Sequence, residues 1–253
     1  MRISTTHVMA VAAALTVTAL GATGPSYAEA QRAGGMAGAP TVGACSTMTP
    51  QQANARSDHS TVVDCSQGHT AQVAGVVKLP KRLDWSRASK NQLFRVVADR
   101  CLPEVAAALG RDAKTRDSSA YHFAYFAPTK AQRAKGARWL SCSIIRPKDT
   151  ELAKLPTSST PFLPGGRLPD PLARCLSTTV LNTPCSAAHA WRATGTFWVA
   201  GTYPGQKALN KKAVGKCRSR VKSDRPYRWT YRDKITWNVA HDHVVVCYSR
   251  TGS

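Results

Sequence analysis

The eight cysteines constrain the fold of this chain more than any other feature, because they form two matching sets of four. The first set is Cys45, Cys65, Cys101 and Cys142, and the second is Cys175, Cys185, Cys217 and Cys247. The second cysteine of each set begins the pattern Cys-Ser-x-x-His, and a glycine follows six residues after the histidine. The pattern contains His69 and Gly75 in one copy, and His189 and Gly195 in the other. Such a match indicates that one small module occurs twice.

The residues between the cysteines predict the same fold in both copies. In the first copy, β-branched runs at residues 61–65 and 71–79 predict strands. Apolar residues at helical spacing predict a helix over residues 89–109. Pro103 lies inside this range and is expected to kink the helix or split it. In the second copy we expect a strand over residues 194–200 and a helix over residues 206–221. The predicted class is α+β, with two related, disulfide-bonded modules that each contain an antiparallel sheet and one packed helix.

An even number of cysteines in an exported chain indicates a disulfide framework. The helix cysteine of each copy is expected to face the sheet, near the cysteine of the last strand. We therefore favour pairing first with second and third with fourth. The favoured bonds are Cys45–Cys65, Cys101–Cys142, Cys175–Cys185 and Cys217–Cys247. Four cysteines allow three connectivities, and the sequence alone does not decide among them.

The N-terminal residues have the features of a signal peptide. Arg2 precedes an uncharged apolar run over residues 8–20, and Ser26 and Ala28 supply the small residues of a cleavage site. Cleavage after Ala30 fits nearly as well. The run is shorter than the about 20 apolar residues that span a bilayer, and no other segment of the sequence approaches that length. We therefore expect a secreted protein, associated with the cell envelope, without a transmembrane segment after cleavage.

Composition predicts the module boundaries. The predicted signal peptide is residues 1–28, and the Ala- and Gly-rich residues 29–40 are expected to be disordered. Module 1 then covers residues 41–148 and module 2 residues 171–253. Prolines are dense in residues 149–170, which favours an extended linker over a packed element.

Positive charge is the most specific hint to function. The chain has 35 Lys and Arg against 14 Asp and Glu, a net charge of +21, which attracts anionic polymers and surfaces. The excess is greatest at residues 207–234, where we expect Tyr227, Trp229 and Tyr231 to turn inward and the cations to bind anions. The candidate anion-binding residues are Lys207, Lys211, Lys212, Lys216, Arg218, Arg220, Lys222, Arg225, Arg228, Arg232 and Lys234.

Four histidines are candidate general bases or metal ligands: His69, His189, His241 and His243. His69 and His189 occupy equivalent places, and a shared structural role, with Gly75 and Gly195, explains this best. On an extended backbone His241 and His243 would face one side, as a transition metal requires, but no third ligand is identifiable. The sequence has no Gly-x-Ser-x-Gly, no His-Glu-x-x-His and no phosphate-binding glycine loop. We therefore expect no catalytic residues, no metal and no cofactor.

The motifs of the first copy resemble the septum formation family, a secreted or membrane-tethered domain of actinobacterial proteins. The residues that match its pattern are, in order, Gly43, Cys45, Val63, Cys65, His69, Cys101, Pro128, Thr129, Gly136, Arg138 and Cys142. The resemblance covers residues 41–148 well and residues 172–250 more loosely. Arg133 stands where the family has tryptophan, and the second copy lacks the Pro-Thr segment but has Trp237. The resemblance implies a link to cell division and no defined catalytic activity.

These observations lead to two hypotheses of function. In the first, the protein is a non-catalytic envelope protein whose basic second module binds an anionic wall polymer or lipid headgroups, while its first module binds a protein partner. In the second, it is a secreted hydrolase or metal-dependent enzyme that uses His69, His189, His241 or His243. Binding of extracellular nucleic acid would rest on charge alone, and we do not expect it.

Overall fold

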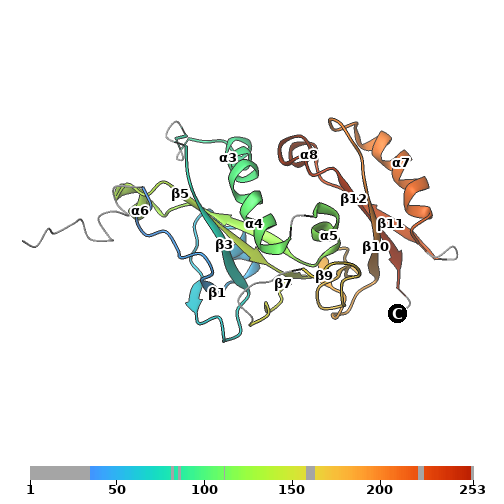
Figure 1. Cartoon of the computed structure of the whole chain (residues 1–253), viewed down its shortest axis with the longest axis horizontal. Helices are drawn as coiled ribbons and strands as arrows, with labels where there is room; N and C mark the ends of the chain where they lie inside the picture. Colours follow the sequence, from blue (N-terminus) through green and yellow to red (C-terminus); the bar gives the residue numbers. More distant parts are fainter. Residues whose placement is uncertain are drawn as a thin grey trace, which may run out of the picture.

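A computed structural model describes residues 35–80, 83–84, 87–110, 112–157, 163–221 and 225–251. The predicted signal peptide, residues 29–34 and Lys222 lie outside the described residues. The chain forms two five-stranded antiparallel sheets, one in each module, with helices packed against them (Figure 1). The structure thus confirms the predicted α+β class.

The sheet of module 1 has the strand order β2-β1-β3-β5-β4. Its strands are β1 (Cys45–Thr47), β2 (Thr61–Val63), β3 (Ala71–Lys78), β4 (His122–Phe126) and β5 (Trp139–Ile145). The helix that covers one face consists of α3 (Lys90–Val96), the π-helical η1 (Val97–Cys101) and α4 (Leu102–Leu109). Pro103 lies in the first turn of α4, directly after the wide turn of η1, so the helix continues through the proline.

Module 1 has three further short helices, α2 (Pro50–Ala53), α5 (Ala113–Ser118) and α6 (Lys130–Ala134). The helices α2, α3 and α6 each begin with a capping box, in which a Thr or Ser side chain and a Gln side chain bond the opposite backbone amides. The local sequence therefore fixes where these helices begin.

Module 2 repeats this topology with the order β9-β8-β10-β12-β11. Its strands are β8 (Arg174–Leu176), β9 (Asn182–Pro184), β10 (Trp191–Trp198), β11 (Tyr227–Thr230) and β12 (Val244–Arg250). The long helix α7 (Gln206–Arg218) takes the place of α3 to α4, and α8 (Lys234–Ala240) takes the place of α6. Because every strand of one sheet has a counterpart in the other, the two modules share one fold.

The two glycines of the repeated pattern lie where the long helix crosses its sheet. The register of β3 shifts just before Gly75, and that of β10 just before Gly195. A Cβ atom on Gly75 would lie 2.5 Å from Cβ of Glu104, and one on Gly195 would lie 3.1 Å from Cδ of Arg220. Glycine therefore permits the close crossing in both modules.

All eight cysteines form disulfide bonds, and the pairs are those favoured from the sequence: Cys45–Cys65, Cys101–Cys142, Cys175–Cys185 and Cys217–Cys247. In each module one bond joins the first two cysteines and the other joins the long helix to an inner strand of the sheet, β5 or β12. No cysteine is left as a free thiol.

The proline-rich segment between the modules is packed, in contrast to the extended linker expected over residues 149–170. A short hairpin joins β6 (Pro147–Lys148) to β7 (Glu151–Leu152). Three leucines of the segment are buried in the core of module 1: Leu155, Leu163 and Leu168. Prolines limit regular structure, but leucines between them still bury apolar surface.

The expectation of disorder over residues 29–40 is wrong for its described part. The carbonyl of Gly35 accepts a hydrogen bond from the amide of Arg138, and that of Ala37 accepts one from the indole of Trp139. The carbonyl of Gly38 accepts one from the side chain of Gln132. This segment therefore lies beside the start of β5, where one backbone amide and two side chains donate hydrogen bonds to it.

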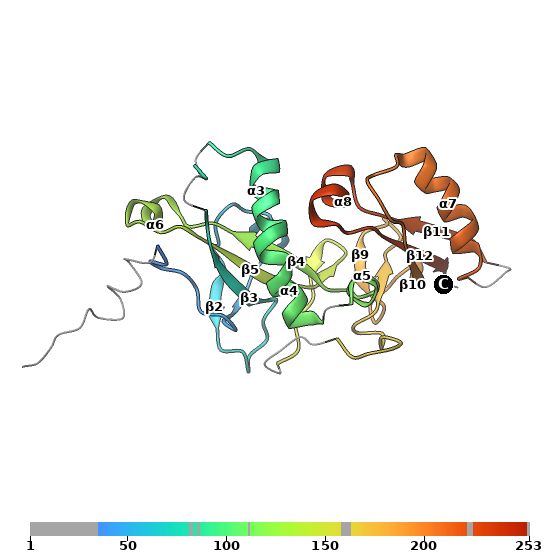
Figure 2. The same ribbon diagram turned by 45° about the horizontal axis from the view of Figure 1, so that its top comes forward.

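The two modules are in direct contact. Helix α5 of module 1 packs on β10 and β12, and α8 of module 2 packs on α3 and η1 (Figure 2). The disulfide Cys175–Cys185 of module 2 belongs to the same apolar cluster as the core of module 1. We call the contact region between the modules the seam.

Candidate functional site: the basic face of α7 and the seam

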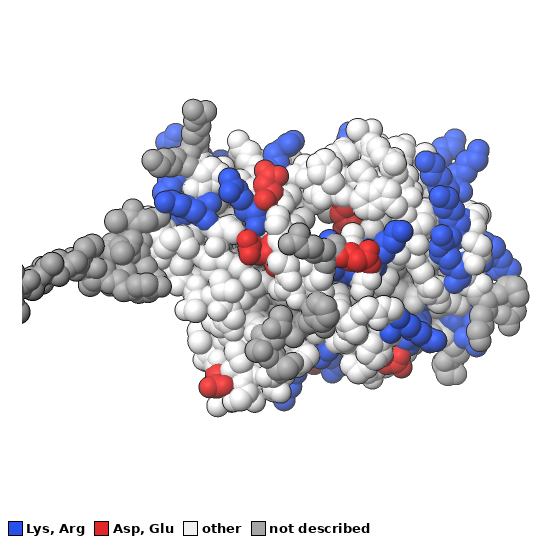
Figure 3. Space-filling view, in the orientation of Figure 1, with Lys and Arg blue, Asp and Glu red and all other residues white. Residues whose placement is uncertain are grey.

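Helix α7 is amphipathic, and its outer side carries the cations. Leu209, Ala213 and Cys217 recur every four residues and are fully buried against the sheet of module 2. The other faces carry five exposed cations: Lys207, Lys211, Lys212, Lys216 and Arg218. Figure 3 shows Lys and Arg gathered in a band over α7. We call this surface the α7 face.

Within the described part of the chain, no carboxylate forms a salt bridge with the four lysines of the α7 face. Two cations lean over aromatic rings of the same module: the ammonium of Lys216 lies 5.2 Å from the ring centre of Phe197, and the guanidinium of Arg218 lies 5.5 Å from that of Tyr227. The α7 face thus keeps its positive charge and can attract an anion.

The three aromatic residues of β11 and the following turn lie beneath α7, as expected from the sequence. The hydroxyl of Tyr227 donates to the carbonyl of Val214 at 3.2 Å. The indole of Trp229 and the hydroxyl of Tyr231 both donate to the Asn210 side chain, at 3.0 and 3.1 Å. These rings attach the helix to the sheet and are not offered to a ligand.

The other candidate cations do not join the α7 face. Arg220 lies over the ring of Phe197 and donates to the carbonyl of Thr196. Arg228 and Arg250 both stack on Trp191. This stack lies on the opposite side of the sheet from the rings beneath α7. Arg225 donates to the carbonyl of Arg250, and Lys234 begins α8. The basic segment is therefore divided among several surfaces, since a strand turns alternate residues to opposite sides.

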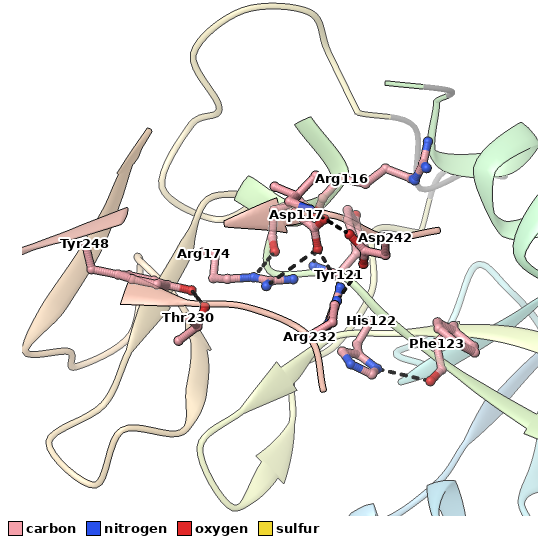
Figure 4. Close-up of polar contacts among 12 residues, drawn as sticks. Arg116, Asp117, Tyr121, His122, Phe123, Arg174, Thr230, Arg232, Asp242 and Tyr248 are labelled. Carbon is pink, nitrogen blue, oxygen red and sulfur yellow. Dashed lines mark hydrogen bonds and ion pairs between the residues drawn. The ribbon is translucent and has the colours of Figure 1, made fainter. Parts of the chain in front are cut away.

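Arg232 is the clearest departure from the predicted anion site. Its guanidinium donates to Asp242 at 2.6 Å and also to Asp117 of module 1 (Figure 4). Two carboxylates neutralise this cation, and it connects the modules. The prediction that Arg232 binds an external anion is thus replaced by a structural role in the seam.

Asp117 is the centre of the charge cluster in the seam. The guanidinium of Arg174 lies 4.0 Å from its carboxylate and also donates to the carbonyl of Ser119 at 2.8 Å. Burial and the nearby Asp242 raise the pKa of Asp117 to about 6, against the opposing effect of Arg232 and Arg174. For Asp242, burial acts to raise the pKa, but the Arg232 charge and hydrogen bonds outweigh it and the pKa is lowered.

His122, at the start of β4, faces the same cluster. Its Nδ1 bonds the carbonyl of Phe123 at 3.1 Å. Burial, with the positive charges of Arg232 and Arg174, lowers the pKa of His122 to about 4. The imidazole is therefore neutral at physiological pH. Nothing in the sequence near His122 signalled this position, because the arginines that face it come from the other module.

A cavity of about 400 Å³ opens in the seam. Its apolar wall comes from the long helix of module 1, with Leu102, Val105 and Leu109, and its polar wall includes Asp117, Asp242 and Arg232. Both of these carboxylates are paired with Arg232. Their arrangement is therefore that of an ion-paired contact between the modules, and it differs from that of a catalytic acid and base that face open solvent.

The histidines of the repeated pattern have matching bonds. Nδ1 of His69 bonds the carbonyl of Gln67 at 2.9 Å, and Nδ1 of His189 bonds that of Ala187 at 2.8 Å. Each bond closes the turn after the second cysteine, which agrees with a structural role. The two histidines lie in different modules.

The imidazoles of His241 and His243 lie near each other, with ring centres 6.2 Å apart in an edge-to-face arrangement, although the backbone at His241 is not extended. His241 adopts a left-handed conformation at the end of α8 and lines the seam cavity, whereas His243 is buried and stacks against Trp237 and Trp198. Among the described residues, no group of three or more His, Cys, Asp or Glu is placed to hold a metal ion. Of the helices that the structure describes, none is long and apolar enough to cross a membrane.

Comparison with known proteins agrees with this architecture. The family model described as septum formation matches residues 16–124 and residues 42–240, and the second range alone takes in most of the chain. The two overlapping ranges are consistent with two copies of the domain. No curated protein and no solved structure matches the chain. With the repeated fold, the paired cysteines and the family match together, the chain belongs to the septum formation family.

Proposed function

We propose that this protein is a non-catalytic protein of the cell envelope that acts in septum formation and binds an anionic polymer through the α7 face. The observation that carries the proposal is the set of four exposed lysines on α7 without a described carboxylate partner. Each cation near an anionic surface adds about 1 kcal/mol of attraction. Four disulfide bonds favour an oxidising compartment outside the cytoplasm.

The non-catalytic part of the proposal rests on the chemistry of the candidate groups. All eight cysteines are bonded, so none serves as a nucleophile. His69 and His189 are tied to backbone carbonyls in separate modules. Asp117 and Asp242 are both held by Arg232. Each of these groups already has a structural partner.

Cosedimentation with purified cell walls tests the proposal. We compare the wild type with the variant K207Q/K211Q/K212Q/K216Q, which removes four charges from the α7 face. We expect the variant to bind at least about a hundredfold more weakly, because four cations contribute up to about 1 kcal/mol each, which together is up to roughly a thousandfold. We expect wild-type binding to be lost in about 1 M salt, where the screening length is about 3 Å.

The matched control removes four exposed lysines away from α7, three in module 1 and one in the proline-rich segment, in the variant K78Q/K130Q/K135Q/K154Q. Net charge changes equally in both variants, so they differ only in where the charges are removed. Because the control leaves the α7 face intact, it should keep most of the binding. Equal loss in both variants would show that net charge alone drives binding, and binding that ignores salt would remove the proposal altogether.

A further inference from the structure

The cations of the α7 face form two rows of different direction. An α-helix turns about 100° per residue, so residues four and seven apart return to one side. Lys207, Lys211 and Arg218 satisfy this spacing and form one outward row along the helix axis. From the helical rise, Lys207 and Lys211 are about 6 Å apart along the axis, and Lys211 and Arg218 about 10 Å.

Lys212 and Lys216 form the second row. They are about one turn apart, and each is rotated by about 140° from Lys207 and Lys211 respectively. The cation–ring contact of Lys216 with Phe197 shows that this row leans toward the sheet of module 2. By helical rotation the outer row lies farther from the buried residues Leu209, Ala213 and Cys217 than the second row does, although Arg218 at its end also leans over Tyr227.

A bilayer does not suit this arrangement. Helices that lie in a membrane interface insert an apolar face between the headgroups. In α7 the apolar residues Leu209, Ala213 and Cys217 are all buried against the sheet. The only large apolar residue of the outer side is Val214, which is 49% exposed. A bilayer would therefore meet charge alone, and both rows would contribute to it alike.

Single-stranded nucleic acid does not suit it either. Proteins that bind such strands stack the bases on exposed aromatic rings. Here Tyr227, Trp229 and Tyr231 lie under α7 with their polar atoms bonded to the helix. Trp191 is covered by the guanidinium groups of Arg228 and Arg250. The α7 face can contact phosphates along a chain but offers no platform for bases.

We propose that the outer row of Lys207, Lys211 and Arg218 binds one strand of a linear phosphodiester polymer without bases, of the polyol phosphate type. This inference rests on the proposed function and names its ligand class. The strand lies along the axis of α7, so that successive phosphates meet the outer row. The flanking pair Lys212 and Lys216 adds only long-range attraction.

Two double variants with equal charge test the inference. K207Q/K211Q removes two of the five positive charges of the α7 face, both from the outer row, and K212Q/K216Q removes two from the flank. The probe is poly(glycerol phosphate), titrated by calorimetry in about 0.15 M salt, where the screening length is about 8 Å. We expect K207Q/K211Q to weaken binding about 30-fold and K212Q/K216Q less than about threefold, because salt screens the more distant pair. Circular dichroism checks that α7 stays folded in both.

Two further probes distinguish other ligands: vesicles of phosphatidylglycerol and phosphatidylcholine, and single-stranded oligothymidine. We expect both to bind more weakly than the polymer. Equal losses in the two double variants would overturn the outer row, and so would tighter binding of either alternative probe. These outcomes leave the proposed function intact if the quadruple variant still loses cell-wall binding. If the quadruple variant binds walls like the wild type, the proposed function itself fails.

Discussion

At the scale of single residues, the same cation serves opposite purposes in this chain. Lys211 and Arg232 belong to one basic segment, yet Lys211 is exposed on α7 while Arg232 is held between two carboxylates. Burial of a charge is tolerated only when partners compensate for lost water. The cost of removing each residue should therefore differ in kind, in stability for Arg232 and in binding for Lys211.

The variant R232M tests this difference. It leaves Asp117 and Asp242 without their shared cation, so we expect the free energy of unfolding to fall by about 3–5 kcal/mol. Urea denaturation measures the loss. The control is R250M, an exposed residue stacked on Trp191, for which we expect a loss of about 1 kcal/mol or less. Similar losses in R232M and R250M would contradict the assignment of Arg232 to the seam.

At the scale of elements, local sequence signals predicted most of the structure. The β3 and α7 ranges begin at the expected residues, because β-branched runs and apolar periodicity act locally. The favoured disulfide pairs are the observed ones, although the sequence alone left three connectivities open in each module. The packing of the proline-rich segment was not predicted, because its three buried leucines do not recur at the spacing of a helix or a strand. The seam was missed as well, because Asp117 and Arg232 are 115 residues apart in sequence and meet only through docking of α5 on the second sheet.

The crossing of helix and strand offers a paired prediction. In G75A the new methyl group would meet Cβ of Glu104, which the helix backbone holds in place, so we expect a loss of about 1–3 kcal/mol in unfolding free energy. In G195A it would meet the flexible Cδ of Arg220, which can move. The lower entropy of the unfolded chain then compensates, and we expect a change within about 1 kcal/mol. Thermal or urea unfolding that ranks G195A as the more damaging would disprove this account.

At the scale of the whole molecule, the seam combines two groups whose protonation affects folding in opposite directions. His122 has a pKa of about 4 in the folded state, below its ordinary value of 6.5, so stability falls as pH drops from about 6.5 to about 4. Asp117 has a pKa of about 6, above its ordinary 3.8, so it adds stability as pH drops from about 6 to about 3.8. The two effects largely cancel over the shared range.

Removing either group should reveal the effect of the other on the pH dependence of stability. Relative to the wild type, we expect the unfolding free energy of H122Q to rise as pH falls from 6.5 to 4, and that of D117N to fall, each by about 1–3 kcal/mol, since one pKa unit corresponds to about 1.4 kcal/mol. Urea titrations at three pH values across this range measure the slopes. Slopes parallel to the wild type in both variants would show that the seam does not couple protonation to stability.

The bond between Cys217 and Cys247 has a mechanical consequence for the proposed binding of a polymer to α7. Tension on a strand bound to α7 would pull the helix away from its sheet, and side-chain contacts alone resist such peeling weakly. The covalent bond passes the load into β12, which is hydrogen-bonded to β10 on one side and to β11 on the other. The pulling force is thereby shared by two ladders of hydrogen bonds, and α7 separates from the module only when the strands of the sheet separate.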